Sequence, residues 1–297
     1  MEEFKIRTDL AVELKEELDE SDSVIRGIEV EEKDTDSGIH VTKLTVLNET
    51  GAKKLGKPIG KYLTLEAVSM AYEDEDYNRE VSVVLAEYLK ELIMPYVKDE
   101  KNLSILVAGL GNRDVTPDAL GPDVVGNMCI ASGIKAIAPG VMAQTGMETA
   151  QIIKGIANQE EPDVIIAIDA LAARSTKRLN RTIQLTDTGI QPGSGVGNHR
   201  NAITKEYIGV PVIALGVPTV IDAPAIVNDT LDNLMLIFKE NTAIKEFTSD
   251  EKYQLIKEIM NPDMKEMFVT PKDTDETIKR IGYTISEAIN IVTAGRI

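Results

Sequence analysis

Tryptophan, cysteine and histidine are scarce in this sequence, and each shortage excludes a kind of structure or site. There is no Trp and only 4% of the residues are aromatic, so the core must be mainly aliphatic. Cys129 is the only cysteine, which excludes an intrachain disulfide and suits a reducing compartment. It lies in an apolar run, where we expect a small core residue. The two histidines, His40 and His199, are far apart in the chain, which disfavours a Ser-His-Asp triad and a zinc site of several histidines.

Long apolar runs and an excess of positive charge are also missing. No apolar run approaches the ~20 residues that a membrane helix needs, and the N-terminus has no apolar signal region. We therefore expect a cytoplasmic protein that makes no membrane contact. The formal net charge of -17 would repel a phosphate backbone, which disfavours direct nucleic-acid binding, whereas basic protein segments would be attracted.

The first quarter of the chain has the pattern of an antiparallel unit. Residues 25–30 and 40–47 alternate between apolar and polar side chains on either side of a turn-rich segment, which predicts a hairpin. Residues 62–65 can add a third strand. We assign residues 10–75 to this antiparallel extension and residues 76–297 to a core of sheet and helices in the same domain.

Three short apolar runs in the rest of the chain predict strands that are buried on both faces. They are Leu103–Ala108, Val164–Ile168 and Val212–Leu215. Helical stretches are expected between them, near 120–132 and 146–158. This alternation predicts an α/β fold with a doubly wound, mostly parallel sheet flanked by helices.

Two acidic residues follow these predicted strands. In open α/β sheets, ligands collect beyond the C-terminal ends of the strands. Asp169 follows the second run directly, and Asp118 could lie opposite it at the start of the next helix. Two carboxylates held close together and partly desolvated can share a proton, and one can then act as general base on a water molecule. Asp118 and Asp169 are therefore the catalytic candidates. The alternative is that each caps a helix, or that Asp169 bonds a neighbouring loop.

The element Gly109-Leu110-Gly111 resembles the start of a dinucleotide-binding motif. Asp114 stands where the third glycine is expected, and its carboxylate would repel a pyrophosphate. A tight turn between strand and loop is the better interpretation of these glycines.

A second glycine-rich loop covers residues 191–200. Its backbone could approach an extended substrate closely, or offer N–H groups to an oxyanion. Gly193, Ser194 and Gly195 are therefore candidate substrate-binding residues. The nucleophile motif G-x-S-x-G of serine hydrolases is absent around Ser194.

Taken together, these segments resemble the spore germination protease family, whose members start the degradation of small acid-soluble spore proteins. The segments that carry the resemblance span nearly the whole chain: Ile6–Glu13, Gly60–Glu66, Gly109–Pro122, Ile168–Arg174, Pro192–Asn198, Gly216–Val220 and Val269–Lys272. Several of them are long and unusual in composition, which argues against a chance match.

The resemblance implies a zymogen that removes its own N-terminus. Residues 1–9 would be the propeptide, and the matching bond is Asp9–Leu10. Family substrates are cut after an acidic residue and before an apolar one, with Ala and then Glu further on. Since Thr8–Glu13 resembles such a site, we expect the propeptide to imitate substrate. The family resemblance also implies a homotetramer in the spore core or developing forespore.

The family's fold is similar to that of the hydrogenase-maturation endopeptidases. Those enzymes place carboxylates at the positions of Asp118 and Asp169, together with a histidine that helps to hold a metal. Here that histidine should come from 193–197, where none stands, and His199 lies several residues late. This departure favours an aspartic-type carboxylate pair without a cofactor, and a divalent metal at Asp118 and Asp169 is the alternative.

Arg174 follows Asp169 by five residues. Its side chain could tune the charge of Asp169, meet an acidic residue of the substrate, or simply be a surface cation. Two other functions stay open beside the endoprotease: a metal-dependent maturation-type endopeptidase, and a non-catalytic scaffold on the same fold.

Overall fold

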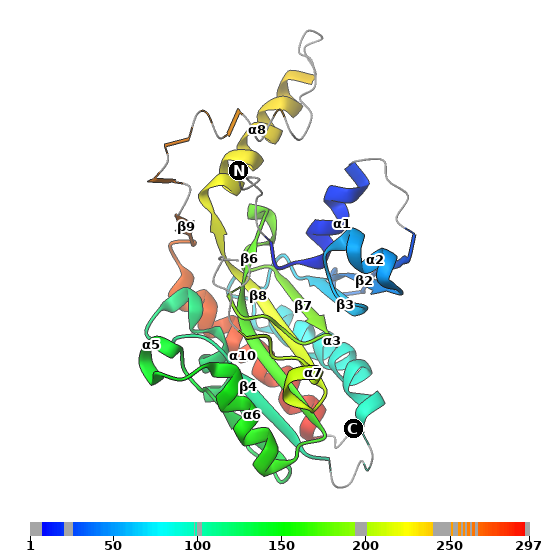
Figure 1. Ribbon diagram of the computed structural model, residues 1–297. Coiled ribbons are helices and arrows are strands. Elements are labelled where there is room, and N and C mark those ends of the chain that lie inside the picture. The colour runs from blue at the N-terminus through cyan, green and yellow to red at the C-terminus, as the bar shows by residue number, and fades with distance from the viewer. Residues whose placement is uncertain are drawn as a thin grey trace.

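A computed structural model describes most of the chain (Figure 1). The described residues are 8–20, 26–97, 99, 103–193, 201–239, 251, 255–256, 258, 260–261, 263–264 and 267–294. Within them, every helix is too short or too polar to span a bilayer.

The described part of the chain alternates between helices and strands. The helices are α1 (Ala11–Glu20), α2 (Glu49–Leu55), α3 (Glu75–Ile93), α4 (Leu120–Asn127), α5 (Met142–Thr145), α6 (Thr149–Glu160), α7 (Lys205–Ile208), α8 (Ala223–Lys239) and α10 (Thr274–Ala294). The strands are β1 (Ile28–Asp34), β2 (His40–Val46), β3 (Gly60–Glu66), β4 (Ile105–Gly109), β5 (Ile134–Ile137), β6 (Val164–Ala173), β7 (Thr182–Thr186), β8 (Val212–Asp222) and β9 (Phe268–Val269).

One mixed sheet runs through the molecule in the order β1-β2-β3-β7-β8-β6-β4-β5, and β9 pairs with β8. The strands β5, β4, β6 and β8 are parallel neighbours, as expected for a doubly wound sheet. The hairpin of β1 and β2 and the third strand β3 are antiparallel, also as expected. The α/β class is confirmed. The antiparallel part extends beyond the N-terminal quarter because β7 pairs antiparallel with both β3 and β8.

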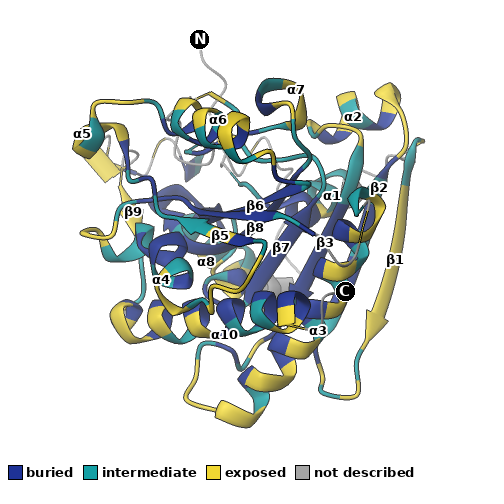
Figure 2. Cartoon of the chain, turned by 90° about the horizontal axis from the view of Figure 1, so that it is seen from below, coloured by how far each residue is buried: buried dark blue, intermediate teal, exposed yellow. Residues whose placement is uncertain are grey.

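Helices cover both faces of this sheet (Figure 2). On one face, α3, α4 and α10 pack their apolar sides against the larger core cluster, which includes Leu85, Leu89, Ile281 and Ile285. On the other face, α6 and α7 close a smaller aliphatic cluster. Burial on both faces explains why the central strands are continuously apolar. It also leaves the strand ends as the natural place for polar groups.

The strands β6, which carries Asp169, and β8 are longer than the apolar runs predicted. β6 continues through Asp169 to Ala173, and β8 continues through Gly216 to Asp222. They stay paired because backbone groups make the ladder, whatever the side chains are, and a bulge at Leu171 adjusts the register.

The helix expected over 120–132 ends earlier, at Asn127, since Met128 is already extended with ψ 143°. Cys129 therefore lies on a loop. It is exposed, so the expected core position is wrong, and its backbone N–H donates to Asn290 at 3.0 Å.

Candidate active site

Asp169 lies in the middle of the β6–β8 pairing, directly opposite Gly216. Its side chain is buried, with 5% exposed, and Oδ1 accepts a hydrogen bond from the N–H of Ala170 at 3.0 Å. Because Asp169 is inside a strand, the interpretation of this residue as a helix cap is wrong. A Cβ on Gly216 would come within 2.6 Å of the Leu171 side chain, so a side chain between the strands at this point has no room.

Asp118 ends a short 3-10 helix, Thr116–Asp118, between β4 and α4. Its Oδ2 accepts the N–H of Asn112 at 2.8 Å, which ties the turn to the loop after β4 rather than capping α4. Gly111 sits at φ 107°, and a Cβ there would be 2.0 Å from the backbone oxygen of Asp118. A glycine is therefore required for the Asp118 turn to close against the loop.

Both carboxylates line one cavity of about 460 Å³ at the C-terminal edge of the parallel strands. Asp9 and Gly193 line the same cavity, which we call the acidic cavity. The structure thus brings together the two predicted catalytic residues, the acidic residue of the predicted cleavage site and one residue of the predicted glycine-rich loop. Two carboxylates so placed could serve as acid and base on a water molecule.

Asp118 and Asp169 supply two carboxylates, but no group of three His, Cys, Asp or Glu residues that could hold a metal is found among the described residues. Ser194 and Gly195, predicted to bind substrate, and His199 lie outside the described residues.

The segment Thr8–Leu10 lies across this edge of the sheet. The N–H of Asp9 donates to the carbonyl of Ala172 at 3.0 Å, and the N–H of Ala172 donates to Asp9 Oδ2 at 2.9 Å. Leu10 is fully buried against Leu171 and Val12.

A second cavity, of about 500 Å³, is also lined by Asp9, Asp169, Leu171 and Gly193. Because the acidic cavity shares these four residues, Asp9 lies where the two hollows meet. The chain on which Asp9 sits therefore occupies a groove large enough for a peptide.

Two residues that the sequence reasoning missed bind the backbone of this segment. Lys57 Nζ donates to the carbonyl oxygen of Asp9 at 2.9 Å, and Gln184 Nε2 donates to the same oxygen at 3.2 Å. Burial lowers the pKa of Lys57, and the carboxylate of Asp9 opposes that shift. The sequence did contain a pattern that points to Gln184. Polar residues alternate with apolar ones on β7, and the structure shows that the polar residues Thr182, Gln184 and Thr186 are buried.

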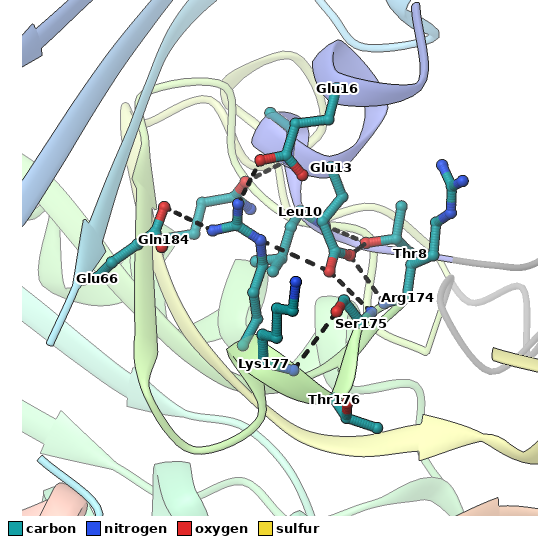
Figure 3. A network of polar contacts seen from close by, with 12 residues as sticks. Thr8, Leu10, Glu13, Glu16, Glu66, Arg174, Ser175, Thr176, Lys177 and Gln184 are labelled. Carbon is teal, nitrogen blue, oxygen red and sulfur yellow. Dashed lines mark hydrogen bonds and ion pairs between the residues drawn. The ribbon is translucent and has the colours of Figure 1, made fainter. Parts of the chain in front are cut away.

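Glu13 is the centre of a polar network on the other side of Leu10 (Figure 3). Its carboxylate accepts the backbone N–H groups of Arg174 and Ser175 at 2.8 and 3.0 Å, and the hydroxyl of Thr8. Arg178 Nε approaches it at 3.7 Å. Burial raises the pKa of Glu13, while these hydrogen bonds and Arg178 favour its charged form. Thr8 and Glu13 thus bracket Asp9–Leu10 from both ends.

The side chain of Arg174 turns towards α1. It is 15% exposed and pairs with Glu17 at 3.0 Å, so the interpretation as a free surface cation is wrong. Glu17 belongs to α1 and lies outside the matched cleavage site Thr8–Glu13, so the contact of Arg174 with an acidic substrate residue stays a prediction.

Comparisons with known proteins show which family the chain resembles. The profile of the family described as germination protease matches residues 6–246. A germination protease of Caldanaerobacter subterraneus subsp. tengcongensis is 43% identical over 96% of this chain and 93% of its own length. The germination proteases of Clostridium tetani and Bacillus subtilis are 43% and 38% identical, each over 97% of this chain and over 95% and 93% of their own lengths.

Among solved structures, the chain is similar to the NiFe hydrogenase maturation protease HycI from Thermococcus kodakarensis. The identity is 15%, the TM-score is 0.37, and the match covers 66% of this chain and 97% of that chain. A likeness at this level carries no argument about the site.

Proposed function

Because the chain belongs to the germination protease family and so is an endopeptidase of spore germination, we propose that it is a zymogen that cuts its own Asp9–Leu10 bond. After activation it cuts small acid-soluble spore proteins after an acidic residue and before an apolar one. Asp118 and Asp169 perform the hydrolysis as an aspartic-type pair.

The position of Asp9 beside both carboxylates is the observation that carries this proposal. Asp9, Asp118 and Asp169 line the same cavity, and Leu10 fills an apolar site next to it. The Asp9 carboxylate accepts a hydrogen bond from the backbone N–H of Ala172 and interacts electrostatically with Lys57. Both interactions suit an acidic side chain on the N-terminal side of the bond that is cut. The buried, hydrogen-bonded Glu13 suits the Glu further along the substrate.

In the proposed mechanism, one carboxylate takes a proton from water as the water attacks the carbonyl carbon of Asp9. The second group gives a proton to the nitrogen of Leu10 as the C–N bond breaks. Residues 1–9 are the propeptide, and the protein is a homotetramer that acts in the spore core.

Self-cleavage of the full chain tests the catalytic pair. Wild type, Asp118→Asn and Asp169→Asn are incubated with and without EDTA, and the products are identified by mass spectrometry. We expect cleavage at Asp9–Leu10 by wild type in EDTA and a loss of rate of about 10²–10⁴-fold in each variant, as general acid–base catalysis requires. The exposed Asp36→Asn is the matched control.

The same reaction separates the competing functions. Loss of cleavage in EDTA, restored by a divalent metal, would replace the carboxylate pair with a metallopeptidase. Full activity of both variants would show that the chemistry lies elsewhere. Absence of turnover on the chain itself and on a Thr-Glu-Ile-Ala-Ser-Glu peptide would favour a scaffold.

A further inference from the structure

The carbonyl oxygen of Asp9 belongs to the bond that is proposed to be cut, and it receives two hydrogen bonds from side chains. The donors are Lys57 Nζ at 2.9 Å and Gln184 Nε2 at 3.2 Å. Lys57 comes from the loop between α2 and β3, and Gln184 from β7. A cation and an amide that converge on one carbonyl oxygen are the donors expected where negative charge develops in acyl transfer.

Gln184 also binds the chain on the other side of the same bond. The N–H of Ala11 donates to Gln184 Oε1 at 2.7 Å. A backbone N–H can only donate, so the amide oxygen must face Ala11 and the NH₂ group must face the Asp9 carbonyl. The orientation of the amide is therefore fixed by its two partners.

The sheet register places Gln184 beside the catalytic candidates. Gln184 is opposite Gly216 on β8, and Gly216 is opposite Asp169 on β6. Residues paired in this way point to the same face of a sheet, and neighbouring strands lie about 4.8 Å apart. Gln184 and Asp169 thus stand on one face, two strands apart, and the residue between them has no side chain. The Asp9 carbonyl lies in the groove that they border.

We propose that Lys57 and Gln184 are catalytic residues that stabilise the oxyanion formed on the carbonyl of the bond to be cut. When water adds to the carbonyl carbon of Asp9, its proton passes to a carboxylate and the C=O electron pair moves to the oxygen. That oxygen is held by the Lys57 ammonium and the Gln184 amide. Collapse of the intermediate breaks the C–N bond and the Leu10 nitrogen takes a proton. This inference rests on the proposed self-cleavage and extends to the same bond in substrates.

The surroundings of Lys57 strengthen its hydrogen bond to the Asp9 carbonyl oxygen. Lys57 is partly buried, and it lines the groove together with Thr8 and Asp9 of the N-terminal segment. A hydrogen bond from a charged donor is stronger where water is excluded. Both bonds are at ordinary length with the neutral carbonyl, so they can tighten as the oxygen becomes an anion.

A purely structural role for Gln184 predicts a different outcome from a catalytic one, and Gln184→Glu separates them. The carboxylate of Gln184→Glu still accepts the N–H of Ala11, and it lies at the N-terminus of α1, where negative charge is favourable. It cannot donate to the Asp9 carbonyl, and it repels an oxyanion. If Gln184 only caps α1, this variant cleaves at the wild-type rate and is at least as stable.

The experiment measures the first-order rate of Asp9–Leu10 cleavage in the full chain by mass spectrometry. Wild type is compared with Lys57→Met and Gln184→Glu, and the thermal unfolding of each variant is recorded. Lys53→Met on the exposed side of α2 and Gln151→Glu on the exposed side of α6 are the matched controls. We expect each groove variant to lose about 10²–10³-fold in rate with unchanged unfolding temperature, and both controls to keep the wild-type rate.

The outcomes distinguish this inference from the function on which it rests. If Asp118→Asn is inactive while Lys57→Met and Gln184→Glu cleave within about threefold of wild type, the oxyanion assignment is wrong and the carboxylate pair stands. If wild type does not cut at Asp9–Leu10, both proposals fall. If Gln184→Glu is slow only because it unfolds, the rate of Lys57→Met tests the oxyanion assignment by itself: a loss of rate in a folded Lys57→Met supports the assignment, and a wild-type rate contradicts it.

Discussion

At the scale of single residues, Arg178 organises the N-terminal segment. It forms ion pairs with Glu16 at 2.6 Å and Glu66 at 2.7 Å, and it approaches the buried Glu13 at 3.7 Å. Glu16 and Glu66 are partly exposed, so their pairs are screened by solvent and contribute little. Glu13 is 2% exposed, and a buried carboxylate without its cation is costly.

We therefore expect Arg178→Met to lower the free energy of unfolding by about 3 kcal/mol, mainly because Glu13 stays buried without a cation. Urea unfolding in an Asp118→Asn background, which keeps the chain uncut, measures this change. The double variant Arg178→Met/Glu13→Gln should recover part of the loss, while the exposed Lys177→Met serves as control. A loss below about 0.5 kcal/mol, typical of surface substitutions, would contradict the role of Arg178.

The candidate residues differ in how far the sequence could predict them. Asp118 and Asp169 were predictable because an apolar run precedes each of them in the sequence, directly for Asp169 and across the loop after β4 for Asp118, and such runs lead to one edge of a parallel sheet. Lys57 and Arg178 carry no such local signal, since their partners come from segments more than 40 residues away in the sequence. Their roles depend on the way β3 and β7 are paired, which a single sequence does not specify.

At the scale of elements, the connection from β4 to α4 is set by close backbone contacts. A Cβ on Gly109 would lie 2.1 Å from the carbonyl oxygen of Gly121, and one on Gly111 would lie 2.0 Å from that of Asp118. These atoms belong to the backbone and cannot rotate away. The position of Asp118 thus depends on glycine at 111, where φ is also positive.

Gly111→Ala should displace the turn of Asp118 and slow self-cleavage by at least tenfold, with a cost in stability of about 1–3 kcal/mol from the strained backbone. Gly155→Ala is the matched control, since nothing lies within 4 Å of its Cβ in α6. Alanine there should leave cleavage unchanged and stabilise the helix by about 0.5–1 kcal/mol. Cleavage assays and thermal unfolding of both variants check these expectations. Equal behaviour of the two would show that the turn tolerates a side chain.

The element pattern was predictable where hydrophobic periodicity is strong. The hairpin, the third strand and the alternation of strands and helices follow from it. The length of β6 and β8 does not follow from it, because Asp169 and Gly216 interrupt the apolar runs while the backbone pairing continues past them. The pairing of β7 with β3, which fuses the two halves of the sheet, involves distant segments and has no local signature.

At the scale of the whole molecule, α3 and α10 present exposed apolar side chains around a shared hollow. Val83, Tyr283 and Ile291 are each more than 40% exposed and line it together with charged residues of both helices, such as Arg79 and Lys279. Exposed apolar groups surrounded by polar residues are typical of contacts between subunits. This face is the one we expect to be covered in the proposed homotetramer.

Sedimentation of the full chain should therefore give four times its 32.4 kDa mass. Tyr283→Glu places a charge in the apolar face and should lower the mass. Leu47→Glu, at an exposed position that follows β2, is the control and should not. A monomer mass for wild type contradicts the tetramer, and an unchanged mass for Tyr283→Glu would place the contact elsewhere.

The burial of Leu10 has a consequence for the fate of the cut chain. Hydrolysis of Asp9–Leu10 would turn a neutral amide into a terminal ammonium on a residue that is 0% exposed. The new ammonium would lie at the start of α1, the positive end of that helix, where a cation is unfavourable. The same step would leave a new carboxylate on Asp9, next to the Lys57 ammonium that already donates to its oxygen, whereas the Leu10 end would be left in an apolar cluster. Because a buried charge in an apolar site is costly, we expect the Leu10 terminus to leave its site for water, and the separation of the two new ends would disfavour their religation.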